Sequence, residues 1–253
     1  MKNSLLQQYR AFLKDTIRKQ IDFSQTDQNR GIAPPPIQKP FDEGALITEL
    51  PKTYPFKGIS DINLSDAIKN RKSRRAFLKL PVSPEELSFL LWATQGIRHM
   101  VDHGHAYRTV PSAGCRHALE TYLLVLNVEG LKQCVYRYLP LEHKLLFEFA
   151  GDDLEAEIVK AVYGQTYPGK AAVTFIWTAI PYRMEWRYDL AAHKVIALDA
   201  GHVCQNLYLA CEAIGAGTCA IGAYDQEAMD RLLKIDGIDE FTVYMAPVGK
   251  VKN

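Results

Sequence analysis

The densest cluster of charge in the sequence is a short basic run with a serine in its middle. It reads Lys69-Asn70-Arg71-Lys72-Ser73-Arg74-Arg75, and five of these seven residues are basic. At the end of a helix, such a run offers guanidinium groups and a hydroxyl to a phosphate or a carboxylate. Two other interpretations stay open: a solvated basic face at a helix C-terminus, and a nuclear-localisation or nucleic-acid patch.

Three further segments combine small residues with charge. The first, Arg108-Thr109-Val110-Pro111-Ser112-Ala113-Gly114-Cys115-Arg116, is a turn between two arginines that precedes a strongly β-prone stretch. The second is the glycine-rich segment Gly215–Ala223, and the third is Pro247-Val248-Gly249-Lys250 near the end of the chain. Glycine-rich sequences mostly make turns, so each segment alone is weak evidence. Their combination in this order is more specific.

Apolar spacing predicts the elements that position these segments. Ser83, Pro84 and Glu86 form a helix start, and Gly96 a helix end. The predicted helices are Leu5–Ile21, a helix from near Ser60 to Asn70, Pro84–Gln95, Leu154–Tyr163, Asp199–Ile214 (capped by Asp199 or the following turn) and Gln226–Leu233. The predicted strands are Thr121–Val128, Val135–Tyr138, Lys144–Phe149, Val173–Ile180, Thr218–Ile221 and Thr242–Val248. The strands meet as hairpins and distant pairs, without regular βαβ alternation, which predicts an α+β fold.

The first 57 residues are predicted to be an extension of a main domain at 58–253. The stretch from residue 23 to 57 contains Pro34, Pro35, Pro36, Pro40, Pro51 and Pro55. Proline prevents regular helix and favours extended chain. Because apolar residues are interspersed among the prolines, this stretch is predicted to be an arm that lies on a surface rather than a free linker.

The overall composition excludes several classes of protein. The chain has 253 residues, 47% of them hydrophobic and 23% charged, with a net charge of +1. A near-neutral chain has no general attraction to nucleic acid or to an anionic membrane. The longest apolar stretches are about ten residues, and a membrane span needs about 20. Five cysteines without a CxxC pair argue against a disulfide framework and a zinc site. With no secretory signal at the N-terminus, these features predict a cytoplasmic protein.

Other residues that could carry chemistry are weaker candidates. His99, His103 and His105 with Asp102 have a metal-ligand spacing, but they fall in a predicted mobile loop, so no metal site is predicted. Cys115 has no evident base partner and is predicted to be packed rather than reactive. No Ser-His-Asp arrangement is evident.

Taken in order, these segments resemble the nitroreductase superfamily, and within it the SagB-type dehydrogenases. The matching blocks are Arg71–Phe77, Leu90–Gly96, Arg108–Gly114, Asp199–His202 with Gln205–Leu207, Gly215–Gly222 and Val248–Lys250. The resemblance covers about residues 58–253. It implies a nitroreductase-like α+β fold with a mixed or antiparallel central sheet flanked by helices. It also implies an entwined homodimer with one FMN in each of two clefts between the subunits.

The resemblance further implies roles for particular residues. Arg71, Lys72, Ser73 and Arg75 would hold the phosphate, ribityl or pyrimidine end of FMN, and Lys250, with Lys252, would complete the phosphate site. Pro111, Ser112 and Ala113 of the partner subunit would pack on the isoalloxazine, and Ile221, Gly222 and Ala223 would line the flavin edge. The chemistry agrees: a dianionic phosphate needs fixed cations, and a glycine lets a peptide N–H approach the flavin closely.

One position departs from the SagB-type pattern. Enzymes of that type that oxidise azoline rings in peptides are expected to use a Lys-Tyr pair, and the nearest match here is Arg187-Tyr188. Arginine cannot act as a general base near neutral pH, so azoline oxidation is in doubt. Tyr188 is a candidate substrate contact; the alternative is that Trp186 and Tyr188 only pack beside the cleft.

The sequence therefore predicts an FMN-dependent oxidoreductase that transfers hydride between flavin and a small or peptidic substrate. No obligatory protein acid or base is expected. Because no GxGxxG motif is present, NAD(P)H would bind at most transiently. Two alternatives stay open. One is a flavin-binding or partner-binding component of a peptide-modification complex, without turnover of its own, whose arm at 23–57 docks a partner. The other is a nucleic-acid-binding module that uses Lys69–Arg75.

Overall fold

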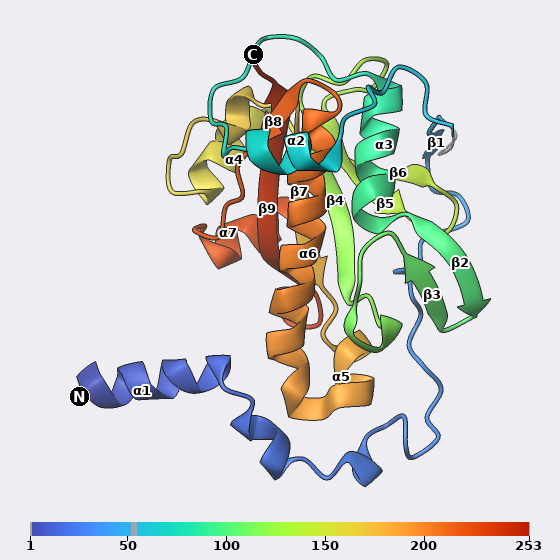
Figure 1. Ribbon diagram of the computed structural model, residues 1–253, viewed down its shortest axis with the longest axis vertical. Coiled ribbons are helices and arrows are strands. Elements are labelled where there is room, and N and C mark those ends of the chain that lie inside the picture. The colour runs from blue at the N-terminus through green and yellow to red at the C-terminus, as the bar shows by residue number, and fades with distance from the viewer. Residues whose placement is uncertain (1, 52–54, 253) are drawn as a thin grey trace.

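A single antiparallel sheet organises the chain (Figure 1). In this computed structural model, which describes residues 2–51 and 55–252, seven strands form one sheet in the order β1-β6-β5-β4-β7-β9-β8, and β2 and β3 form a separate hairpin. The strands are β1 Ile47–Glu49, β2 Ile97–Asp102, β3 His105–Arg108, β4 Leu119–Val125, β5 Cys134–Leu139, β6 Lys144–Phe149, β7 Val173–Ala179, β8 Ala216–Thr218 and β9 Phe241–Lys250. Neighbouring strands of the sheet pair antiparallel. The predicted α+β class is confirmed.

Helices cover both faces of the sheet. They are α1 Lys2–Leu13, α2 Leu64–Asn70, α3 Pro84–Gln95, α4 Leu154–Ala161, α5 Tyr182–Tyr188, α6 Ala192–Glu212 and α7 Gln226–Leu233. The long helix α6 lies along the sheet and, with α3, packs on one face, while α4 and α7 pack on the other. The central strands β4 and β7 are buried along their whole length. This explains why apolar residues occupy both faces of each strand, because a strand buried on both faces does not alternate.

The predicted start of α3 is confirmed in detail. The backbone N–H of Glu86 donates to the Ser83 hydroxyl at 3.2 Å, and the backbone N–H of Ser83 donates to the Glu86 carboxylate at 2.9 Å. Together these bonds satisfy two amides that the first turn of a helix leaves open. Gly96 caps the C-terminal end, as predicted.

Several predicted boundaries are wrong. The first helix ends at Leu13 rather than Ile21, and a short 3-10 turn, Thr16–Gln20, follows it. The second helix begins at Leu64 rather than near Ser60. Helix α6 begins at Ala192, so Asp199 is not its cap but lies buried inside it. The Ser112 hydroxyl donates to this carboxylate, so the buried polar group inside the helix has a hydrogen-bond partner.

The predicted mobile loop around the three histidines is also wrong, because this stretch forms the β2–β3 hairpin. At its turn, the backbone N–H of Gly104 donates to Asp102 at 2.7 Å, and the His105 ring lies 2.8 Å from the same carboxylate. In the described part of the chain, no group of three or more metal-ligating side chains comes together. Nor does any helix described there have the length and apolar character needed to cross a bilayer.

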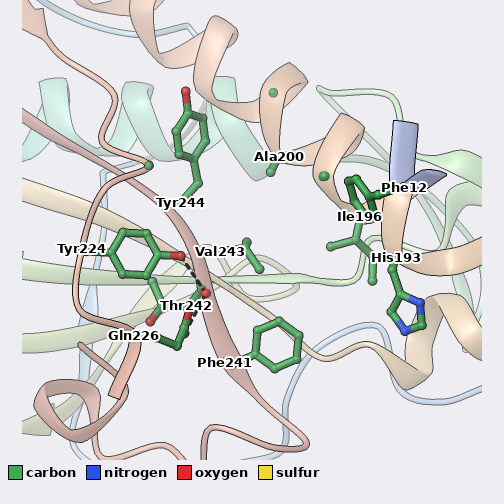
Figure 2. A pocket seen from close by; sticks show the side chains of 13 residues that line it. Phe12, His193, Ile196, Ala200, Tyr224, Gln226, Phe241, Thr242, Val243 and Tyr244 are labelled. Carbon is green, nitrogen blue, oxygen red and sulfur yellow. Dashed lines mark hydrogen bonds between the residues drawn. The ribbon is translucent and has the colours of Figure 1, made fainter. Parts of the chain in front are cut away.

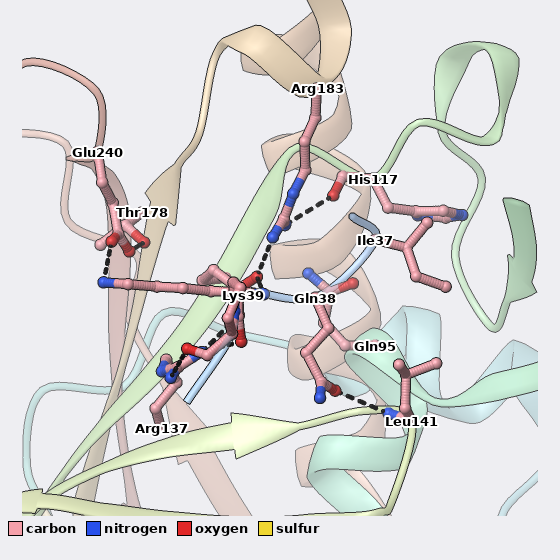
Figure 3. Close-up of polar contacts among 12 residues, drawn as sticks. Ile37, Gln38, Lys39, Gln95, His117, Arg137, Leu141, Thr178, Arg183 and Glu240 are labelled. Carbon is pink, nitrogen blue, oxygen red and sulfur yellow. Dashed lines mark hydrogen bonds and ion pairs between the residues drawn. The ribbon is translucent and has the colours of Figure 1, made fainter. Parts of the chain in front are cut away.

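Part of the N-terminal arm is tied to the sheet (Figure 3). Two arginines donate to its backbone carbonyls: Arg108 to Ile37 at 2.7 Å, and Arg137, labelled in Figure 3, to Lys39 at 2.8 Å. The backbone N–H of Lys39 donates in turn to buried Glu120 at 2.8 Å. Further along the arm, β1 pairs with β6 and adds an edge strand to the sheet. These segments of the arm are therefore engaged by their own chain.

Candidate functional site

The basic run and the glycine-rich segment lie side by side. After α2 ends, the chain extends past β8, and Ser73 forms a parallel bridge with Thr218. The backbone N–H of Arg74 donates to the Thr218 carbonyl at 2.8 Å, and that of Leu78 donates to Lys250 at 2.8 Å. The fold thus brings together three of the predicted blocks, at Arg71–Phe77, Gly215–Gly222 and Val248–Lys250.

Two glycines allow this close passage. A methyl group at position 217 would overlap the Cγ of Arg74, and one at position 249 would lie 2.8 Å from the Cγ of Phe77. Real Cβ atoms essentially never approach other atoms this closely, so a larger residue would push the basic segment away from the sheet. These two glycines are explained by packing within the chain.

Tyr208 of α6 joins the segments together. Its hydroxyl lies 3.0 Å from the Ser73 hydroxyl and accepts a hydrogen bond from the backbone N–H of Ala220 at 2.9 Å. The guanidinium of Arg71 lies over its ring, 5.2 Å from the centroid. The sequence did not single out Tyr208, because it falls on the apolar stripe of a strongly periodic helix. The sequence signal that could have found it is a tyrosine on a predicted buried stripe, since a buried tyrosine hydroxyl usually has a hydrogen-bond partner.

The cations of this segment differ in how they are engaged. Arg75 lies over the ring of Tyr167, 5.9 Å from the centroid, and burial raises the pKa of Tyr167 to about 12, so that phenol stays neutral. Among the described residues, neither Arg71, Lys72 nor Arg75 forms an ion pair with a carboxylate. Such a segment carries positive charge that an anion can still neutralise.

Lys250 is engaged differently. Its ammonium group forms an ion pair with Glu86 of α3 and donates to the carbonyl of Ile214 at 2.7 Å. Both side chains of the pair are mostly buried, at 18% and 15% exposure. The charge of Lys250 is therefore already balanced within the chain, whereas Lys252 is exposed.

A cavity of about 600 Å³ opens beside Gly222 (Figure 2). Apart from His193, its lining contains no ionisable side chain other than two tyrosines. The residues are Phe12, His193, Ile196, Ala197, Ala200, Gly201, Gly222, Tyr224, Gln226, Phe241, Thr242, Val243 and Tyr244. A Cβ added at Gly222 would meet only Tyr244 among the described atoms, at 3.9 Å. Packing within the chain therefore does not explain this glycine.

The turn at Pro111–Gly114 lies elsewhere along α6. The Ser112 hydroxyl donates to Asp199 at 2.5 Å and accepts from the backbone N–H of His117 at 3.0 Å. Burial raises the pKa of Asp199, and the Ser112 hydrogen bond opposes that rise. Asp199 and Tyr208 are nine residues apart in α6, about 14 Å along its axis. One chain therefore does not place Pro111, Ser112 and Ala113 beside the basic segment.

Tyr188 packs against this turn. Two guanidinium groups lie over its ring, that of Arg187 at 5.5 Å and that of Arg18 at 5.9 Å from the centroid. Gly114 has a φ of +58°, and a side chain there would overlap both Arg187 and Tyr188. The Arg187–Tyr188 pair and the turn thus form one packed unit, which leaves both interpretations of Tyr188 open.

Fold and site together define an α+β protein whose glycine-rich segment meets the basic segment at Thr218 and a cavity of about 600 Å³ at Gly222. The chain belongs to the nitroreductase family, whose family model matches residues 68–250. Proteins of this family are typically flavin-dependent oxidoreductases and usually bind FMN.

Two relatives support this assignment from sequence. The chain is 31% identical over 192 residues to MJ1384 of Methanocaldococcus jannaschii, which is named as a nitroreductase; the match covers 76% of this chain and 93% of that protein. It is 25% identical over 163 residues to the trifolitoxin-processing protein TfxB of Rhizobium leguminosarum. This second match covers 63% of the chain and 44% of TfxB, so the chain spans less than half of that protein.

Solved structures share the fold. A Ralstonia eutropha crystal structure, described as that of a nitroreductase, superposes with a TM-score of 0.67 at 24% identity, covering 87% of this chain and 99% of that one. A chain of the Escherichia coli microcin synthetase complex McbBCD, with truncated pro-MccB17 bound, superposes with a TM-score of 0.60 at 20% identity. That match covers 81% of this chain and 79% of the other.

Proposed function

We propose that the protein is an FMN-dependent oxidoreductase that works as a homodimer. The observation that carries the proposal is the basic segment around Arg71 and Arg75, which has no carboxylate partner among the described residues and is fixed beside the glycine-rich segment by Tyr208. In this proposal, residues 58–253 carry the flavin site and residues 1–57 extend it. FMN supplies the hydride chemistry when bound, and the protein supplies binding and electrostatics.

The residues present fit the phosphate end of FMN. A dianionic phosphate is stabilised by several cations, and we assign Arg71, Lys72 and Arg75 to it, with the Ser73 hydroxyl as a further contact. Lys250 was expected in the same site from the sequence. Its ion pair with Glu86 supports a different role, in which it fixes the end of β9 against α3.

The residues also fit the ring end of the cofactor. Gly222 has no packing partner that requires a glycine, and Gly222 and Ala223 are both exposed. We therefore assign them, with buried Ile221, to the flavin edge, where a peptide N–H stabilises developing charge. The cavity beside Gly222 offers an apolar wall that keeps water from the ring.

A second subunit completes the proposed site. The turn at Pro111–Ala113 is bonded to Asp199, about 14 Å along α6 from Tyr208, so in one chain it does not lie beside the basic segment. Two α6 helices that pair antiparallel would bring the turn of one subunit to the basic segment of the other. The exposed face of α6 suits such a pairing, because Gly201 has no neighbour within 4 Å among the described residues and Leu198 is 55% exposed.

The substrate is proposed as a class only. We propose a small-molecule or peptidic substrate, with NAD(P)H as a transient electron donor. The likeness to TfxB and to McbBCD favours a second candidate, a flavin-binding component of a peptide-modification complex related to the SagB-type dehydrogenases. Arg187 stands where a basic lysine is expected in azoline oxidation, and it argues against that particular reaction. The five cysteines, all in the described part of the chain, are unpaired, which supports a location in the reducing cytoplasm.

The proposal is tested by the visible spectrum of the purified protein and by titration with FMN. We expect a flavin spectrum, and we expect Arg71→Ala/Arg75→Ala to weaken FMN binding at least about 100-fold, because two charged contacts are lost. Lys79→Ala, an exposed cation outside the assigned site, is the matched control and should bind FMN normally. Colourless protein that binds no FMN would refute the proposal.

Turnover separates the two candidate functions. With flavin bound and oxygen excluded, NAD(P)H should bleach the flavin spectrum, and a quinone or a nitroarene should restore it. If dithionite reduces the flavin but no acceptor reoxidises it, the component without independent turnover is supported instead.

A further inference from the structure

Helix α1 presents an apolar stripe to solvent. Its large apolar side chains are highly exposed: Leu5 53%, Leu6 45%, Tyr9 72%, Phe12 50% and Leu13 71%. At 100° per residue they fall within about a third of the helix circumference, the width of a face that normally packs against other protein. Figure 1 shows α1 extending away from the body of the molecule.

Such a helix needs a covering surface. Helices of 12 residues are marginal in water unless their apolar face packs against something. Phe12, at the C-terminal end of α1, reaches the large cavity near His193 and Ile196. The rest of the stripe continues from that point into open space, so α1 is anchored near the N-terminal end of α6 and projects from it.

A groove suited to an apolar helix lies near the other end of α6. It has a volume of about 420 Å³ and lies between α2, α3 and α6, with apolar walls that include Leu64, Phe89, Trp92, Leu209 and Ala213. Leu64 is 66% exposed and Ile68, one turn further along α2, is 56% exposed. An open groove of this kind is a common receptor for an amphipathic helix.

One chain cannot fill its own groove with its own α1. Ile196, near the anchor of α1, and Leu209, in the groove, are 13 residues apart in α6, about 20 Å along its axis. In two α6 helices that pair antiparallel, the N-terminal end of one lies beside the C-terminal end of the other. That arrangement brings α1 of each chain toward the groove of its neighbour.

We propose that α1 of each protomer packs into the groove between α2, α3 and α6 of a second copy of the chain. This inference rests on the homodimer of the proposed function and adds an exchanged helix to it. The chemistry of the two surfaces agrees with the docking, because the exposed apolar stripe of α1 would meet the apolar walls of the groove. In this dimer, the N-terminal arm of each subunit contacts the other subunit through α1.

Disulfide cross-linking in the full-length chain tests the contact. In a Cys115→Ser background, Tyr9→Cys on the apolar stripe is combined with Leu64→Cys in the groove, and the oxidised protein is run on a non-reducing gel. The matched control combines Leu64→Cys with Gln7→Cys, on the opposite face of α1. We expect most of the Tyr9→Cys chains to run as covalent dimers, and less than about a tenth of the control chains, because i and i+2 positions face different directions.

A second experiment does not depend on cysteine geometry. Leu5→Ser/Tyr9→Ser/Leu13→Ser should weaken dimerisation at least about 100-fold in sedimentation, because three apolar contacts are lost. Asn3→Ser/Gln7→Ser/Arg10→Ser, on the polar face, should leave it unchanged. FMN absorbance is recorded on the same samples. Dimers that bind FMN but neither cross-link nor respond to the apolar triple would overturn the exchanged helix and leave the proposed function standing; a colourless monomer would overturn both.

Discussion

The hydroxyl oxygens of Ser73 and Tyr208 lie 3.0 Å apart, although the two residues are 135 positions apart in the sequence. The same phenol accepts from the backbone N–H of Ala220 at 2.9 Å, and its ring lies beneath Arg71. One side chain of α6 therefore sets the position of the basic segment relative to the glycine-rich segment. If these segments hold the two ends of one cofactor, Tyr208 determines the distance between them.

We expect Tyr208→Phe to weaken FMN binding about tenfold while the protein stays folded. The change removes one oxygen that serves both Ser73 and Ala220, and a lost hydrogen bond of this kind costs about 1 kcal/mol or slightly more. Fluorescence titration with FMN measures the effect. The control is Tyr138→Phe, which removes another buried phenol, 2.7 Å from His143 and away from the basic segment. Equal affinity in the two variants would contradict the role given to Tyr208.

Two glycine substitutions should affect different properties, one the stability of the fold and the other the binding of FMN. Gly217→Ala places a methyl group onto Arg74 and should lower the free energy of unfolding of the flavin-free protein by about 1–3 kcal/mol, the usual cost of overpacking. Gly222→Ala meets only Tyr244, at 3.9 Å, and should change that free energy by less than about 0.5 kcal/mol. It should nevertheless weaken FMN binding, because its methyl group occupies space assigned to the flavin.

Urea unfolding of the flavin-free protein and FMN titration measure the two effects separately. A stable Gly217→Ala variant would contradict the packing explanation of that glycine. Normal FMN binding by Gly222→Ala would remove Gly222 from the flavin edge.

The parts of the fold that the sequence predicted correctly are those fixed by local signals. The start of α3 could be predicted because the side chains of Ser83 and Glu86, four residues from end to end, each accept a hydrogen bond from the other's backbone N–H. Strands β4 and β7 were legible because burial on both faces leaves long apolar runs. The β2–β3 hairpin was missed because its exposed positions mix polar residues with apolar ones such as Met100 and Val101, so the sequence shows no alternation of buried apolar and exposed polar residues.

The candidate site could be predicted only in part, because its geometry depends on long-range contacts. The sequence motifs identified the segments that meet at Thr218. They could not identify the contacts of single side chains, because the partner residues lie far away in the sequence. Asp199 looked like a helix cap because its hydroxyl partner, Ser112, is 87 residues away. Lys250 is predicted to be a phosphate ligand, and the sequence could not show its ion pair with Glu86, because that carboxylate is 164 residues away.

The Lys250–Glu86 pair gives a test of the revised role of Lys250. Lys250→Met leaves Glu86 mostly buried without its cation, and it should lower the free energy of unfolding by about 1–3 kcal/mol. Glu86→Gln should cost a similar amount, and the double variant should cost less than the sum of the two, as expected for contacting residues. FMN affinity should fall much less in Lys250→Met than in Arg71→Ala/Arg75→Ala. An equal loss would restore Lys250 to the phosphate site.

Buried His117 should make stability depend on pH. The side chain is 5% exposed, and burial, reinforced by the positive charge of Arg108, lowers its pKa to about 2 from the usual 6.5. Its Nε2 lies 3.1 Å from the carbonyl of Ala106, which fits a neutral ring that donates. Between pH 6.5 and pH 2 the unfolded chain binds a proton that the folded chain rejects. Stability therefore falls as pH falls through this window, by at most about 1.4 kcal/mol per pH unit from this group.

The contribution of His117 is isolated by comparison with His117→Gln, whose amide can donate to Ala106 but does not titrate. Urea unfolding at pH 7.5 and pH 5 should show the wild-type chain losing about 2 kcal/mol more than the variant, since about 1.5 pH units of the window are crossed. Other titrating groups, including His143, whose pKa burial also lowers, act equally in both proteins and cancel in the difference. Parallel stability curves would mean that His117 accepts a proton in the folded state despite its burial.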